Sequence, residues 1–127
     1  MSEQPTNWAE VQADGAIAEY AALDVALETM RSMLEAVDDS IGNIQTALVA
    51  VRQAVAQLPE VTGLEQSLQV EIHKQLRLLE MDGAFLRTAR QATTVAQRRS
   101  AMLDRVVLLR SYCATGMTLR EAPTPQD

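Results

Sequence analysis

The sequence predicts an all-α protein that folds as an antiparallel helical bundle, with four helices expected. Aromatic residues make up only 3 % of the 127 residues, whereas hydrophobic residues make up 47 %. The hydrophobic residues are chiefly Ala, Leu, Val and Met, a set that favours helices over strands. In addition, hydrophobic positions recur every three or four residues through the first half of the chain. That period is typical of a helix with one buried face.

The first helix is expected to begin at Asn7, because Glu10 follows three residues later as in a capping box. A hydrophobic stripe then alternates spacings of three and four residues, as in a coiled coil. Its members are Tyr20, Leu23, Leu27, Met30, Leu34, Val37, Ile41, Ile44, Leu48, Val51, Val55 and Leu58.

The segment Asp38–Asn43 argues against one continuous helix, because five of its six residues favour turns or caps. A helix from residue 8 to residue 58 would also be about 75 Å long at about 1.5 Å per residue, more than a small domain can cover. We therefore expect a break near Asp38–Ser40, with Asp39 or Ser40 capping the second helix. The alternative is one long N-terminal coiled-coil helix, dimerised through its stripe and followed by two shorter helices.

The third helix is expected to follow Pro59, which disfavours helical geometry at the residue before it. Thr62 with Glu65 predicts a capping box at its start. The pattern predicts that this helix ends at Ala89 or Arg90.

The fourth helix is expected to begin at Thr94, with Gln97 as the capping partner, and to end before Gly116 at the C′ position. We expect residues 1–117 to form a single bundle domain and residues 118–127 to form a flexible tail. The core stripe of the fourth helix consists of Met102, Val106, Leu109 and Cys113.

Two hydrophobic rows run along the expected third helix. The first row consists of Leu76, Leu79, Gly83 and Leu86. The second row, beside it, consists of Leu78, Met81 and Phe85. A helix with so wide a hydrophobic arc must be covered on two sides, by neighbouring helices or by a second protein. The second row is therefore a candidate interface, either with a partner or with a second copy in a homodimer.

Charge is divided unevenly along the chain. Residues 1–58 hold nine acidic and two basic residues, whereas residues 59–115 hold six acidic and eight basic residues. The molecule is therefore expected to have an acidic face and an arginine-rich face. This division is explained either by pairing between the helices of the bundle or by an external acidic partner.

No set of residues in the sequence predicts catalysis, and we expect a protein that is not an enzyme. His73 and Cys113 are the only histidine and cysteine, so we expect neither a metal site nor a cofactor. Cys113 falls in a hydrophobic helical pattern and is expected to be buried and inert. His73 followed by Lys74 is similar to a histidine phosphotransfer domain, but the large residues 75–78 leave this as a remote alternative.

Nucleic-acid and membrane binding are also disfavoured. The net charge is −6, and no aromatic residues alternate with the arginines to stack on bases. No hydrophobic run approaches the about 18 residues that span a bilayer. The N-terminal residues resemble no export signal, so a cytoplasmic protein is expected.

Part of the chain, roughly residues 68–115, resembles the cyanobacterial PatD family. The resemblance rests on Lys74–Asp82, Phe85-Leu86, Ala89–Gln91, Asp104-Arg105, Leu108 and Tyr112-Cys113. It implies a non-catalytic regulator of cell division that binds the tubulin-like GTPase FtsZ and modulates its assembly. In filamentous cyanobacteria, such a regulator would influence heterocyst frequency.

If the partner is acidic, as the resemblance to FtsZ regulators implies, arginines of the second half are the expected contacts, because their guanidinium groups pair with carboxylates. The expected partner-binding residues are Arg77, Arg87, Arg90, Arg98, Arg99 and Arg105. The competing explanation is that several of them pair inside the bundle with Glu28, Glu35 or Asp82. A different class of function, a structural coiled-coil adaptor or oligomeric scaffold, would suit the hydrophobic stripe.

Overall fold

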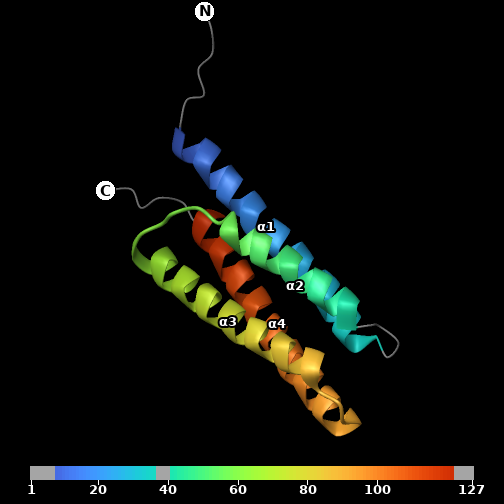
Figure 1. Ribbon diagram of the computed structural model, residues 1–127. Helices are drawn as coiled ribbons and strands as arrows, with labels where there is room; N and C mark the ends of the chain where they lie inside the picture. Colours follow the sequence, from blue (N-terminus) through green and yellow to red (C-terminus); the bar gives the residue numbers. More distant parts are fainter. Residues whose placement is uncertain (1–7, 37–40, 122–127) are drawn as a thin grey trace, which may run out of the picture.

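The computed structural model describes residues 8–36 and 41–121, and this part of the chain is helical without strands. The helices are α1 (Trp8–Glu35), α2 (Ile41–Ala56), α3 (Gly63–Thr88) and α4 (Ala92–Glu121). Figure 1 shows the α1–α2 hairpin lying beside the α3–α4 hairpin, with sequential helices antiparallel. Both α1 and α3 pack against α2 and against α4. The prediction of an all-α antiparallel bundle is confirmed.

The hydrophobic stripe is divided between two helices, because α1 ends at Glu35 and α2 begins at Ile41. The expected break is confirmed, and the alternative of one long N-terminal helix is wrong. Folding the stripe back allows its two halves to cover each other, which one extended helix cannot do. The expected caps at Asn7, Asp39 and Ser40, together with stripe residue Val37, lie outside the described residues.

The core contains the expected hydrophobic residues from all four helices. The α1 members of the stripe from Tyr20 to Leu34 are buried, and Ile41 and Leu58 are half-buried at its ends. The first row of α3 is buried throughout, as expected. The buried residues of α4 are Met102, Val106, Leu109, Cys113 and Gly116.

The start of α3 differs from the expected capping box. Thr62 occupies the N-cap position, but its side chain makes no capping hydrogen bond. The Glu65 carboxylate instead accepts hydrogen bonds from the Tyr20 hydroxyl (2.9 Å) and from Arg120 Nε (2.9 Å). The capping-box prediction is wrong because tertiary partners on α1 and α4 bind the carboxylate.

The bounds of α4 also differ from those expected. The helix begins at Ala92, so Thr94 and Gln97 lie inside its first turns and do not cap it. It continues through Gly116 to Glu121. Gly116 is not a C′ residue but a point of close packing, because a Cβ atom added there would lie 2.6 Å from Tyr20 Cε1.

Candidate protein-binding surface

Two of the six expected binding arginines hold α4 against α3. Arg105 Nε donates to Asp82 Oδ2 (2.8 Å), and Arg98 Nη1 lies 3.4 Å from Asp82 Oδ1. Arg105 Nη1 also donates to Gln75 Oε1 (3.2 Å). The Asp82 side chain is only 8 % exposed. Arg98 and Arg105 therefore neutralise a buried carboxylate. For Asp82, this agrees with the competing explanation, in which the arginines pair inside the bundle.

A third arginine closes the end of α1. Arg99 Nη2 donates to the carbonyl oxygens of Met33 (3.0 Å), Leu34 (3.0 Å) and Ala36 (2.7 Å). The last carbonyl groups of a helix receive no hydrogen bond from an N–H group of the same helix. Arg99 supplies the missing donor, so its role in the bundle is structural.

The acidic residues of α1 pair with arginines outside the expected set. Arg110 Nε donates to Asp24 Oδ1 (2.8 Å), and Arg110 also pairs with Glu28. Arg31 pairs with Glu28 and Glu35. Hydrogen bonding from Arg31 lowers the pKa of the Glu28 carboxyl. The expected pairing of Glu28 and Glu35 with the six arginines is wrong, because Arg31 and Arg110 lie closer on α1 and α4.

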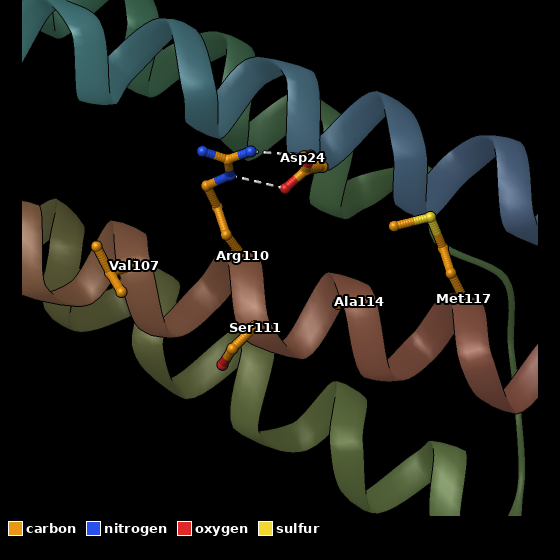
Figure 2. A pocket seen from close by; sticks show the side chains of 6 residues that line it. All are labelled: Asp24, Val107, Arg110, Ser111, Ala114 and Met117. Carbon is orange, nitrogen blue, oxygen red and sulfur yellow. Dashed lines mark hydrogen bonds and ion pairs between the residues drawn. The ribbon is translucent and has the colours of Figure 1, made fainter.

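The Arg110–Asp24 pair lines a hollow between α1 and α4 (Figure 2). Its volume is about 370 Å³, and its apolar lining residues are Val107, Ala114 and Met117. Two hydrogen bonds join the Arg110 guanidinium group to the Asp24 carboxylate, so the two charges neutralise each other. This hollow therefore offers a ligand little unpaired charge, and it is the weaker candidate site.

The other three arginines are exposed, and none of them has an ion-pair partner within residues 8–36 and 41–121. Arg77 lies in the middle of α3, Arg87 in its last turn and Arg90 in the connection to α4. At about 100° per residue, Arg87 lies about 80° around the helix axis from Arg77. The structure thus leaves three arginines available to a partner but does not gather all six on one face.

The second hydrophobic row of α3 remains at the surface. Met81 and Phe85 are each 49 % exposed, and Leu78 is half-buried. The Arg98 guanidinium carbon lies 4.5 Å from the centroid of the Phe85 ring. This contact orients the ring, since a cation over an aromatic face is attracted to it.

The exposed row extends further toward the start of α3 than the sequence indicated. Val70 is 60 % exposed, and it lies eight residues before Leu78 on the same side of the helix. An open, largely apolar hollow of about 410 Å³ is lined by Val70, His73, Lys74, Arg77 and Leu78. We define the outer strip of α3 as Val70, Lys74, Arg77, Leu78, Met81 and Phe85.

Groups able to take part in covalent chemistry are buried or isolated. Cys113 is fully buried, as expected, and burial raises the pKa of its thiol to about 12. Burial likewise raises the pKa of Tyr20 to about 12. His73 is exposed on α3 beside the hollow. Within the described ranges, no three His, Cys, Asp or Glu side chains converge in a way that would hold a metal ion.

Comparison with known proteins adds no relative: no family model, no curated protein and no solved structure matches this chain. Among the described helices, none combines the length and hydrophobicity needed to cross a membrane. The fold and the exposed outer strip of α3 are therefore the basis for assigning a function.

Proposed function

We propose that this chain is a non-catalytic binding protein that contacts an acidic protein partner through α3 and the α3–α4 connection. The observation that carries the proposal is the division of the arginines. Arg98, Arg99 and Arg105 form ion pairs or hydrogen bonds with other residues of the bundle. Arg77, Arg87 and Arg90 are exposed without a partner in the described part of the chain, and the first of them borders exposed hydrophobic residues.

The same surface explains why the chain would favour a protein over other ligands. Guanidinium groups pair with carboxylates in a two-point geometry, which gives orientation as well as attraction. Half-exposed Met81 and Phe85 supply side-chain types that are enriched in protein interfaces. A partner that combines carboxylates with apolar side chains would satisfy both.

FtsZ is the partner that we propose first, because residues 68–115 resemble the PatD family and contain every residue of this surface. On this proposal the chain binds FtsZ and modulates its assembly during cell division. In a filamentous cyanobacterium the same activity would influence heterocyst frequency.

Co-sedimentation with FtsZ assembled in GTP tests the proposal. We expect the natural chain to pellet with the filaments and the triple variant Arg77→Glu, Arg87→Glu, Arg90→Glu to stay in the supernatant. Replacing the same three arginines by lysine keeps the charge and should retain part of the binding. Gln53→Glu, which adds a carboxylate at an exposed position on α2, is the control for position and should pellet normally.

Two results would contradict different parts of the proposal. If the natural chain does not pellet, FtsZ is not the partner. If the natural chain and the triple glutamate variant pellet equally, binding uses another surface.

A further inference from the structure

We propose that the outer strip of α3 is a docking surface for an acidic amphipathic helix. This inference rests on the proposed function, since it names the surface and the kind of partner segment involved. The strip combines a row of exposed apolar side chains with two cationic side chains on the same helix face, Lys74 and Arg77.

The shape of the strip fits a helical ligand. Its members recur at intervals of three, four or one residue, so they form a continuous line along one side of α3. From Val70 to Phe85 the line is about 22 Å long at about 1.5 Å per residue. A helix of about four turns covers that length, with its own apolar residues at a matching spacing. The hollow beside Leu78 offers a place for one such side chain.

The charge of the strip favours an acidic ligand. Arg77 has no ion-pair partner among the described residues, and Lys74 Nζ reaches Glu71 only at 4.0 Å. The nearby acids are engaged elsewhere on the bundle: Glu80 pairs with Arg52 on α2, and Asp82 is buried between α3 and α4. The strip therefore has a net positive charge that carboxylates on both flanks of a bound helix would complement.

The same charges argue against a second copy of this chain as the occupant. In a symmetric pair of α3 helices packed through their strips, the two Arg77 side chains would lie close together near the centre of the contact. Like charges in that position oppose association. An external helix that carries carboxylates would attract Arg77 and would avoid this repulsion.

A synthetic peptide can serve as the probe. The peptide has about 18 residues, blocked ends, Leu at helical spacing along one face and Glu on both flanks of that face. We expect it to bind the full chain in a fluorescence anisotropy titration. A matched peptide with Lys in place of Glu should bind at least about tenfold more weakly.

Variants of the chain then locate the binding site. Met81→Glu places a carboxylate among apolar contacts, and Arg77→Glu reverses the central charge, so each should weaken binding at least about tenfold. Both residues are exposed, and circular dichroism should show unchanged helix content. Val25→Glu on α1 and Gln53→Glu on α2, both at exposed positions away from the strip, are matched controls that should change binding by less than about twofold.

The inference is overturned if neither peptide binds, or if Met81→Glu and Arg77→Glu bind the acidic peptide as the natural chain does. It is also overturned if Met81 mediates self-association seen by light scattering, or binding to anionic lipid vesicles, in place of peptide binding. Failure of the FtsZ assay combined with specific peptide binding would reject FtsZ alone. FtsZ binding that is unaffected by Met81→Glu, combined with no peptide binding, would reject the docking surface alone.

Discussion

At Gly116 the absence of a side chain lets α4 lie directly against the Tyr20 ring. An added Cβ atom would lie 2.6–2.9 Å from three atoms of that ring. We therefore expect Gly116→Ala to lower the free energy of unfolding by about 1 to 2 kcal/mol, because overpacking outweighs the gain in helix propensity. Urea denaturation measures the change.

A double-mutant cycle with Tyr20→Leu tests the cause. Without the ring, Gly116→Ala should cost less than it does in the natural chain. An increase in stability for Gly116→Ala alone would show that the contact with Tyr20 is not limiting.

Asp82 is the residue on which the α3–α4 interface depends most for charge balance. Asp82→Ala removes the carboxylate that pairs with Arg98 and Arg105 and, among the described residues, leaves Arg105 only its hydrogen bond to Gln75. Loss of a buried partner is strongly destabilising, but both guanidinium groups reach solvent in part, so we expect a cost of about 2 kcal/mol. Thermal and urea unfolding should detect it. The exposed Asp104→Ala on α4 should change stability by less than about 0.5 kcal/mol, and equal effects of the two substitutions would contradict the assignment.

The buried thiol of Cys113 gives the stability a dependence on alkaline pH. Burial raises its pKa from 9.0 to about 12 in the folded chain. Between these values the unfolded chain binds fewer protons than the folded chain, so stability falls as pH rises. The slope from this group is at most about 1.4 kcal/mol per pH unit.

Urea denaturation at several pH values from about 8 to about 9, where an unfolded tyrosine of pKa 10.0 is still mostly protonated, measures this slope as it develops. Cys113→Ser should flatten it. The native thiol should also react with a disulfide reagent only after unfolding, and fast reaction of the folded chain would contradict its burial.

At the scale of elements, Arg99 joins the end of α1 to α4. Arg99→Ala removes the donor for the three carbonyl oxygens of Met33, Leu34 and Ala36. We expect a loss of about 1 to 2 kcal/mol and faster hydrogen exchange in the last turn of α1. Exchange measured by mass spectrometry should locate the change there, and Arg87→Ala should not reproduce it. Unchanged exchange in α1 would show that the turn is held by other contacts.

The elements were predictable where their signals are local. The hydrophobic stripe places Leu23, Leu27 and Met30 in the core, and turn-forming residues divide α1 from α2. The helix ends were less predictable, because distant contacts decide them. Glu65 has the spacing of a capping residue, yet Arg120, 55 residues away, is one of its partners.

The same limit applies to the candidate binding surface. The sequence identifies Met81 and Phe85 as a second row, and the structure leaves both half-exposed. The sequence does not reveal which arginines form ion pairs inside the bundle, because Arg98 and Arg105 are 16 and 23 residues from Asp82 along the chain. The packing of α4 against α3 gives Arg98 and Arg105 an ion-pair partner and leaves Arg77 without one among the described residues.

For the whole molecule, the uneven charge along the chain is partly neutralised within the bundle. The Arg110–Asp24 and Arg120–Glu65 pairs each join a basic residue of α4 to an acidic residue of another helix. The cations that remain without a described partner lie on α3 and on the connection after it. The molecule thus presents a positive, partly apolar surface although its net charge is −6.

The methionine methyl groups report directly on the proposed docking of a protein partner on the outer strip of α3. Met81 lies on the strip, Met117 lines the hollow between α1 and α4, and Met30 and Met102 are fully buried. The measurement is a methyl NMR titration of ¹³C-methionine-labelled chain with FtsZ in its GDP form. We predict that the Met81 signal shifts or broadens first while those of Met30, Met102 and Met117 stay in place. A response at Met117 with none at Met81 would contradict docking on the outer strip of α3.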